Sequence, residues 1–136
     1  MKHYVFDTHC WVSFLSNNRF EELIIAFIDN DVKTFTCYEQ FSEFKDIHTK
    51  HIKIQKLLPG KTDFYTKAIQ DVVYLYEPEK RYRLLFDYKD NYLIDIAHQT
   101  KSILVTNDRG FKVATKLKTP PVKIISLHQF YSSIGF

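Results

Sequence analysis

Residues 102–108, which read Ser-Ile-Leu-Val-Thr-Asn-Asp, form the clearest predicted β-strand of the chain and end in an acidic residue. A second apolar run at residues 3–7 also ends in an acidic residue, Asp7. Helical patterns lie between these runs. This alternation of strand and helix is typical of an α/β protein, in which a central parallel sheet is covered by helices on both faces.

The other elements follow from the spacing of the apolar residues. Residues 20–28 carry apolar side chains at i, i+3, i+4, i+7 and i+8, which predicts one face of a helix. Residues 32–36 form a further apolar run, and a helical pattern then continues as far as Pro59-Gly60. The remaining predicted elements are a helix after residue 61, an extended piece at 72–76, a loop at 79–88, a helix from Asp90, a short helix at 109–114, a strand at 122–127 and a helical turn at 128–134.

The length and composition fit one domain. The chain has 136 residues, of which 45% are hydrophobic, so it can supply a core of ordinary size. Cys10 and Cys37 form no motif and are expected to be reduced thiols in or near the core. The sequence shows no signal peptide and no apolar run long enough to span a membrane. We therefore predict a single domain at residues 1–136, a cytoplasmic location and no membrane partner.

Four acidic residues occupy positions that such a sheet brings to one edge. Asp7 and Asp108 follow strands, Glu43 lies on the helix after the strand at 32–36, and Asp90 opens a helix. Ligands of open α/β sheets bind beyond the carboxyl ends of the strands. Four acids that converge there cannot all remain ionised without a cation. The pattern therefore predicts a hard divalent metal ion and chemistry on phosphate.

Each of these acids also has a structural alternative. Asp7, Asp90 and Asp108 precede a turn or helix, so each carboxylate can cap the backbone there. Capping and metal binding are compatible, because a carboxylate has several lone pairs. Glu43 competes with Glu39 and Asp46, which lie four residues before it and three residues after it on the same helix.

Four segments together resemble the PIN domains, in particular those that are toxin components of toxin–antitoxin modules. The likeness extends from about residue 3 to residue 127, and it implies a PIN-like three-layer α/β/α sandwich with a central parallel sheet. One departure is that PIN domains usually carry Asn two residues after the first Asp, where this chain has His9. The segments are Val5-Phe6-Asp7-Thr8, the helix turn from Cys37 to Glu43, Asp87-Tyr88-Lys89-Asp90-Asn91 and Val105-Thr106-Asn107-Asp108.

The resemblance implies a metal-dependent endoribonuclease. Asp7, Glu43, Asp90 and Asp108 would hold one or two Mg²⁺ or Mn²⁺ ions, and a metal-activated water would hydrolyse an RNA phosphodiester bond. Further residues would support these ligands from around the site. The supporting residues are His9, Asn91, Thr106 and Asn107.

The charge of the chain is compatible with an RNA substrate. The net charge is +3 and the pI about 8.8, which is mildly basic. Once four acids are assigned to a metal, the remaining surface is distinctly positive, as a protein that binds a phosphate backbone requires. Arg81, Arg83 and Arg109 are the candidates for RNA contact. The other expected partners are a cognate antitoxin that masks the acidic pocket and further copies of the chain in a homodimer or higher oligomer.

Single residues distinguish this function from other function classes. A degenerate PIN-like module that binds RNA or protein without cutting is the alternative, and His9 favours it. A haloacid-dehalogenase-like enzyme would need a second Asp at the position of His9, and a receiver domain would need an acidic pair after the first strand, so both are rejected. His48 and His51 have no accompanying Cys or third His at zinc-ligand spacing, and we expect both at the surface.

Overall fold

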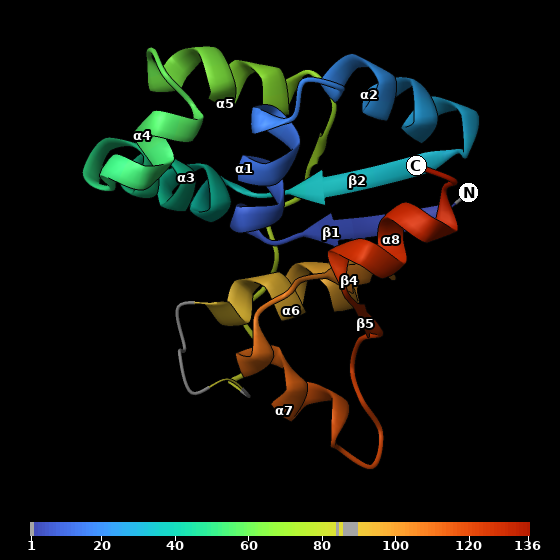
Figure 1. The fold of residues 1–136 in the computed structure, drawn as a ribbon. Coiled ribbons are helices and arrows are strands. Elements are labelled where there is room, and N and C mark those ends of the chain that lie inside the picture. Colours follow the sequence, from blue (N-terminus) through green and yellow to red (C-terminus); the bar gives the residue numbers. More distant parts are fainter. Residues whose placement is uncertain (1, 84, 86–89) are drawn as a thin grey trace.

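A five-stranded parallel sheet lies at the centre of the molecule (Figure 1). The computed structural model describes residues 2–83, 85 and 90–136. Strand β1 pairs in parallel with β2 on one side and with β4 on the other, so the chain extends the sheet in both directions from β1. The strands are β1 (Lys2–Phe6), β2 (Val32–Thr36), β3 (Tyr74–Leu75), β4 (Ile103–Val105) and β5 (Ile124–Ile125), in the order β3-β2-β1-β4-β5.

Helices cover both faces of this sheet. They are α1 (Thr8–Ser16), α2 (Phe20–Asp29), α3 (Tyr38–Lys50), α4 (Ile52–Leu57), α5 (Thr62–Gln70), α6 (Asn91–Gln99), α7 (Lys112–Thr115) and α8 (Leu127–Ser133), with a 3-10 helix η2 (Arg109–Phe111) before α7. Figure 1 shows α1, α2 and α5 on one side of β1 and β2, and α6 and α7 on the other. The predicted three-layer α/β/α sandwich with a parallel central sheet is confirmed.

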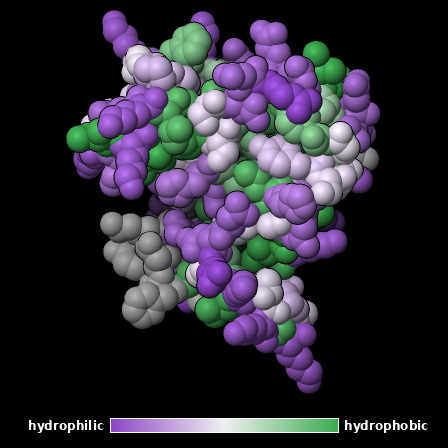
Figure 2. Space-filling model, in the orientation of Figure 1, coloured by the Kyte–Doolittle hydropathy of each residue, from purple (hydrophilic) through white to green (hydrophobic). Residues whose placement is uncertain are grey.

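The outer surface is largely polar. Figure 2 shows hydrophilic side chains over most of the visible face, with hydrophobic residues in smaller patches between them. Within the part of the chain that the structure describes, each helix is too short or too polar to cross a membrane.

The alternation of side chains along β1 explains why both faces need a cover. Tyr4 and Phe6 point into one hydrophobic core, and Val5 points into the other, because successive residues of a strand face opposite sides of the sheet. Strand β4 repeats the pattern, since Val105 joins the core of Phe6 and Leu104 joins the core of Val5. All five side chains are buried, so β1 and β4 form the interior of the sheet.

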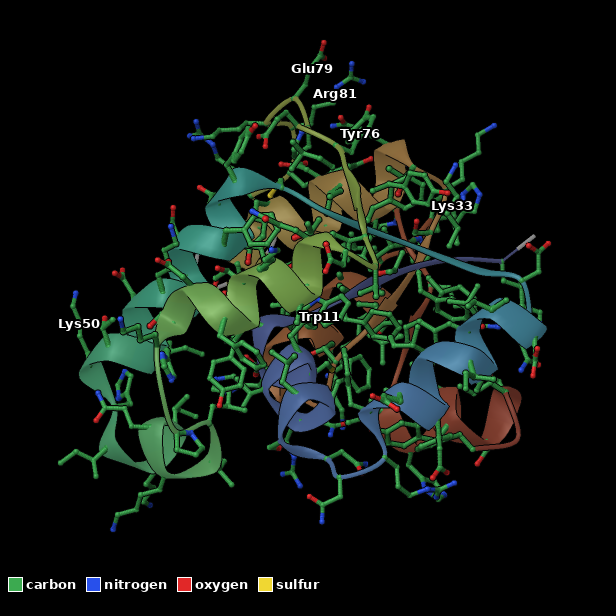
Figure 3. All side chains as sticks on the ribbon, turned by 90° about the horizontal axis from the view of Figure 1, so that it is seen from above. Trp11, Lys33, Lys50, Tyr76, Glu79 and Arg81 are labelled. Carbon is green, nitrogen blue, oxygen red and sulfur yellow. The ribbon has the colours of Figure 1, made fainter. Side chains whose placement is uncertain are left out.

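Phe6 is the centre of an aromatic cluster that fastens three helices to β1. Its ring centroid lies 5.7 Å from that of Trp11, 5.0 Å from Phe14, 5.9 Å from Phe27 and 4.8 Å from Phe130. Three of these pairs are edge-to-face, which is a favourable arrangement for aromatic rings. In Figure 3, Trp11 lies in the interior of the molecule, between helices.

The structure adds one helix that was not predicted. Residues 8–16 form α1, which begins after Asp7. The side chain of Asp7 accepts a hydrogen bond from the backbone N–H of Cys10 at 2.8 Å and so caps this helix. The alternation of apolar and polar residues there is weak, because most of the first turns of α1 are buried. Cys10 and Cys37 are both free and buried, as predicted.

Several element ends differ from the predictions. The strand predicted at 122–127 shortens to Ile124–Ile125, because Ser126 already caps α8 by accepting the backbone N–H of Gln129 at 3.1 Å. The helical pattern before Pro59 divides into α3 and α4 at His51, whose backbone is extended. These differences change the lengths of elements but leave their order as predicted.

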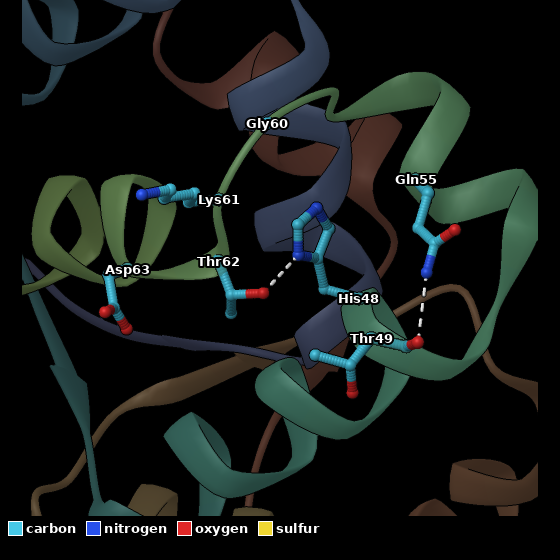
Figure 4. Close-up of a pocket in the computed structure, with 7 residues that line it drawn as sticks. All are labelled: His48, Thr49, Gln55, Gly60, Lys61, Thr62 and Asp63. Atoms are coloured by element: carbon cyan, nitrogen blue, oxygen red, sulfur yellow. Dashed lines mark hydrogen bonds between the residues drawn. The ribbon is translucent and has the colours of Figure 1, made fainter.

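The surface position predicted for His48 is wrong. This side chain is buried, and both ring nitrogens are engaged: Nδ1 lies 2.5 Å from the hydroxyl of Thr62, and Nε2 lies 2.7 Å from the carbonyl oxygen of Leu58 (Figure 4). A shallow cavity of about 610 Å³ borders the pair. His48 therefore joins α3 to α5 and to the end of α4. His51, by contrast, is exposed.

The aromatic cluster generates a test of the core. Replacing Phe6 with Ala leaves a void between four rings, and we expect the free energy of unfolding to fall by about 3–5 kcal/mol. Urea denaturation followed by circular dichroism measures this change. Phe64 is a matched control, since its side chain is 73% exposed and Phe64→Ala should stay within about 0.5 kcal/mol of the wild type. Equal stability of the two variants would contradict the assignment of the core.

Candidate active site at the carboxyl ends of β1 and β4

The order of the strands changes direction between β1 and β4. From β1 the sheet continues through β2 and β3 on one side and through β4 and β5 on the other. In open α/β sheets, the crevice beyond the carboxyl ends of the strands at such a switch point is where ligands bind. Asp7 directly follows β1, and Asp108 follows Val105, the last residue of β4, by three positions. Two of the predicted acids therefore lie at this crevice.

One hydroxyl group connects these two acids. Thr106 Oγ1 donates a hydrogen bond to Asp7 Oδ2 and accepts the backbone N–H of Asp108 at 3.0 Å. The backbone N–H of Asp7 donates to the carbonyl oxygen of Val105 at 3.1 Å. Asp7 and Thr106 are 7% and 5% exposed, whereas Asp108 is at the surface. The carboxylate of Asp7 is thus held in one orientation beside the turn that carries Asp108.

Asp7 and Asp108 also have the capping role that was their structural alternative. Asp7 Oδ1 accepts the N–H of Cys10 at the start of α1, and Asp108 Oδ1 accepts the N–H of Gly110 at 2.9 Å at the start of η2. A carboxylate oxygen has two lone pairs, so a capping carboxylate retains the capacity to bind a cation.

Glu43 is held by a tyrosine that was not predicted as a site residue. Glu43 is half-buried on α3, and its Oε2 accepts a hydrogen bond from the hydroxyl of Tyr92 on α6 at 3.0 Å. The same hydroxyl lies 3.5 Å from Thr8 Oγ1. Burial raises the pKa of Tyr92, and the charge of Glu43 raises it further, so the phenol remains protonated. In the sequence Tyr92 looks like an ordinary core residue of an amphipathic helix, and no local pattern distinguishes it.

Asp90 and Asn91 stand at the start of α6. Asp90 is half-buried at the N-cap position, and Asn91 is buried with its Oδ1 accepting the backbone N–H of Leu85 at 3.1 Å. Asn91 therefore holds the backbone of Leu85 at the start of α6. Asp87, the first acid of the same sequence motif, lies outside the described residues.

The other two predicted supporting residues have different surroundings. His9 is exposed in the first turn of α1. Asn107 accepts the backbone N–H of Leu127 at 3.0 Å and so ties the end of β4 to the start of α8. Thr106 and Asn107 thus both stabilise the turn that carries Asp108.

A cavity of about 730 Å³ opens between α3 and α6 next to Glu43. Acidic residues of α3 line it together with two cationic residues, Lys80 and Arg83, which we call its cationic wall. Glu43 is the predicted metal ligand that borders this cavity, as far as the described residues show its lining. The lining residues are Glu39, Ser42, Glu43, Asp46, Lys80, Tyr82, Arg83, Asn91, Tyr92 and Asp95.

The cationic wall is fastened to α6 by side chains of that helix. Asp95 is 2% exposed, and its Oδ1 accepts the backbone N–H groups of Arg81 at 3.2 Å and Tyr82 at 2.9 Å. One turn later, Gln99 accepts the backbone N–H of Glu79 at 3.0 Å and donates to its carbonyl oxygen at 2.7 Å. These bonds hold residues 79–82 along α6, and Arg83 follows at the border of the cavity.

The three arginines predicted to contact RNA are placed differently. Arg83 borders the cavity, and Arg109 is exposed in η2 directly after Asp108. The guanidinium group of Arg81 pairs with Glu79 at 2.8 Å, and this hydrogen bond raises the pKa of Arg81. Figure 3 shows Arg81 and Glu79 together at one end of the molecule, pointing away from it. Arg83 is therefore the arginine best placed to face a ligand in the cavity.

The donor set can be tested against a divalent metal. Carboxylate oxygens are the donors that Mg²⁺ and Mn²⁺ prefer, so the chemistry of Asp7, Glu43, Asp90 and Asp108 fits. Within residues 2–83, 85 and 90–136, however, no three Asp, Glu, His or Cys side chains are grouped closely enough to hold one ion. Two of the carboxylates are instead oriented by hydroxyl groups of Thr106 and Tyr92.

Comparison with known proteins identifies the fold. No protein-family model and no curated protein sequence matches the chain. The solved structure of PAE2754 from Pyrobaculum aerophilum is similar with a TM-score of 0.67 and 12% identity, over 98% of this chain and 96% of that one. VapBC2 from Rickettsia felis, solved bound to a DNA fragment from its promoter, is similar with a TM-score of 0.60 and 12% identity, over 91% of this chain and 98% of that one.

At 12% identity these likenesses concern the fold. Both relatives are PIN-domain proteins, and each alignment covers nearly all of both chains. The chain therefore has the PIN-domain fold that its four sequence motifs predict.

Proposed function

We propose that this chain is a divalent-metal-dependent endoribonuclease that hydrolyses RNA phosphodiester bonds. The observation that carries the proposal is the hydroxyl of Thr106, which joins Asp7 and Asp108 at the switch point of a PIN-like sheet. Asp7, Glu43, Asp90 and Asp108 would hold Mg²⁺ or Mn²⁺. When bound, the ion would lower the pKa of a water molecule and neutralise charge that develops on the phosphate.

The remaining residues bind and orient in this proposal. Arg83 and Lys80 line the same cavity as the acids of α3, so they can attract the RNA backbone while the acids retain the metal. Arg109, beside Asp108, supplies a further cation, and Arg81 contributes at longer range. Thr106 orients Asp7 directly.

His9, Asn91 and Asn107 support the surrounding turns. Asn91 and Asn107 do so through the backbone of Leu85 and Leu127. His9, in the first turn of α1, stands where PIN domains usually carry Asn.

The biological role we propose is that of a toxin in a toxin–antitoxin pair. The support is the similarity in fold to VapBC2 together with the sequence motifs. The cognate antitoxin would cover the acidic cavity, for example by inserting an Arg that pairs with the carboxylates. We propose further that the chain acts in the cytoplasm as a homodimer or higher oligomer.

A second candidate is a PIN-like module that binds RNA or protein without cutting. It is favoured by the acids of the described part of the chain, which are not grouped around a common point. His9 in place of the usual Asn points the same way. The two candidates differ in whether carboxylate charge is needed for an activity, and this difference can be measured.

The first prediction concerns cleavage. Asn at position 108 keeps an oxygen that can accept the N–H of Gly110, so Asp108→Asn preserves the cap and removes one charge. Cleavage of RNA in Mg²⁺ or Mn²⁺ should fall at least about tenfold, while RNA affinity in a gel-shift assay stays equal or rises. If the wild type and Asp108→Asn bind equally and neither cuts RNA in either metal, the binding module is the correct function.

The second prediction separates two neighbouring arginines. Arg83→Ala should weaken RNA binding and lower the slope of log affinity against log salt by about one. Arg81→Ala is the matched control and should have a smaller effect, because Glu79 already pairs with its guanidinium group. Fluorescence anisotropy with labelled RNA across a salt series measures both. A larger effect of Arg81→Ala would contradict the assignment of the cavity as the RNA site.

The third prediction concerns the toxin role. Expression of the wild-type chain should arrest bacterial growth, and co-expression of the protein encoded by a neighbouring gene should restore it. Asp7→Asn should be harmless at the same level of folded protein, because it removes a proposed metal ligand. Growth curves with immunoblots provide the measurement. Harmless expression of folded wild type would exclude the toxin role without excluding nuclease activity.

A further inference from the structure

The hydroxyl of Tyr92 touches two of the elements that bear the proposed metal ligands. It donates to Glu43 Oε2 of α3 at 3.0 Å and lies 3.5 Å from the hydroxyl of Thr8 in α1. Thr8 directly follows Asp7, and Tyr92 itself follows Asp90 by two positions on α6. This single group therefore connects α1, α3 and α6 at the point where each of them carries or adjoins a proposed ligand.

The surroundings of Tyr92 make its hydroxyl a fixed and neutral donor. The side chain is 5% exposed, and its ring belongs to the core formed by Val5, Leu93 and Leu104. Its single proton is directed at Glu43, and Thr8 can donate to the phenolic oxygen in turn. A hydroxyl donor orients a carboxylate and brings no charge of its own, so it does not compete with a cation for Glu43 as a Lys or Arg would.

Asp7 is held in the same way by a hydroxyl group. Its Oδ2 accepts a hydrogen bond from the buried hydroxyl of Thr106. Two of the proposed ligands are thus each oriented by a neutral, buried hydroxyl group. Carboxylates that bind metals are commonly oriented by such partners, and loss of a partner typically weakens metal binding 10–100-fold.

We propose that Tyr92 is a positioning residue of the metal site, which acts by fixing the orientation of the Glu43 carboxylate. This inference rests on the proposed function. Tyr92 adjoins the cavity but acts through Glu43 rather than on RNA. With Glu43 held in place, binding of a divalent cation needs less rearrangement of side chains. The conformational entropy of the Glu43 side chain has already been lost on folding.

The test compares two tyrosines that lose the same group. Tyr92→Phe removes the hydroxyl and keeps the ring. Tyr65→Phe is the matched control, because Tyr65 is also buried and donates its hydroxyl to the carbonyl oxygen of Pro59 at 2.5 Å, away from the proposed ligands. The melting temperature is followed during titration with MnCl₂, since an ion that binds the folded state raises it by mass action.

We expect Tyr92→Phe to bind Mn²⁺ about 10–100-fold more weakly than the wild type. Tyr65→Phe should bind Mn²⁺ as the wild type does, although it is less stable. Cleavage of RNA by Tyr92→Phe should recover at high Mn²⁺, because all four carboxylates are still present. A loss that is merely structural would lower stability in both variants without shifting the dependence on Mn²⁺.

A second pair of variants keeps the inference testable if Tyr92→Phe does not fold. Thr8→Val removes the hydroxyl that contacts Tyr92 and should weaken Mn²⁺ binding in the same direction, whereas Thr8→Ser retains the hydroxyl and should not. If the wild type binds Mn²⁺ and Tyr92→Phe, or Thr8→Val in its place, binds it equally well, the inference is overturned and the proposed function stands. A wild type that neither binds Mn²⁺ nor cuts RNA would overturn the proposed function itself.

Discussion

The parallel pairing of β1 with β4 is the constraint on which the rest of this structure depends. Phe6 lies opposite Val105 in the register, so Asp7 and Thr106, the residues that follow these two strands, emerge side by side. That is why a threonine hydroxyl reaches a carboxylate 99 positions away in sequence. A slip of one residue would turn Phe6 out of its aromatic cluster and would separate Asp7 from Thr106 at the same time. The burial that fixes the register therefore also fixes the site.

Helix α6 organises the other side of the crevice. Its first turns present Tyr92 to Glu43, and its later turns hold the segment at residues 79–82 through Asp95 and Gln99. The same helix packs Leu93 and Ala97 into the core beside β1. Helix α6 thus positions both Glu43 on α3 and the cationic wall of the cavity. Because α6 packs against the sheet, both are held at a fixed place relative to it.

Much of the fold was predictable because its signals are local or periodic. The strands at β1, β2 and β4 are short apolar runs, and the acids that follow them mark the functional edge. Helix α1 was missed because it is buried around much of its surface, so its apolar residues show no clear helical period. The burial of His48 was missed for a different reason, since its partners Thr62 and Leu58 belong to other segments. Tyr92 was missed likewise, because its significance depends on Glu43, which is 49 positions away.

The strands become shorter toward both edges of the sheet, and this affects the tendency of the molecule to aggregate at high concentration. Its inner strands β1 and β2 have five residues each, whereas the two outermost strands, β3 and β5, have two each. An outer strand offers unpaired backbone groups to any extended chain that it meets, and long outer strands seed aggregation. Here Tyr74 and Leu75 are about half exposed, but β3 consists of these two residues alone, so the edge offers few backbone groups for pairing. The long apolar strands β1 and β2 are paired with other strands on both sides. Their backbone groups are therefore not available for pairing with other protein molecules, although the chain is rich in aromatic residues that favour β-structure.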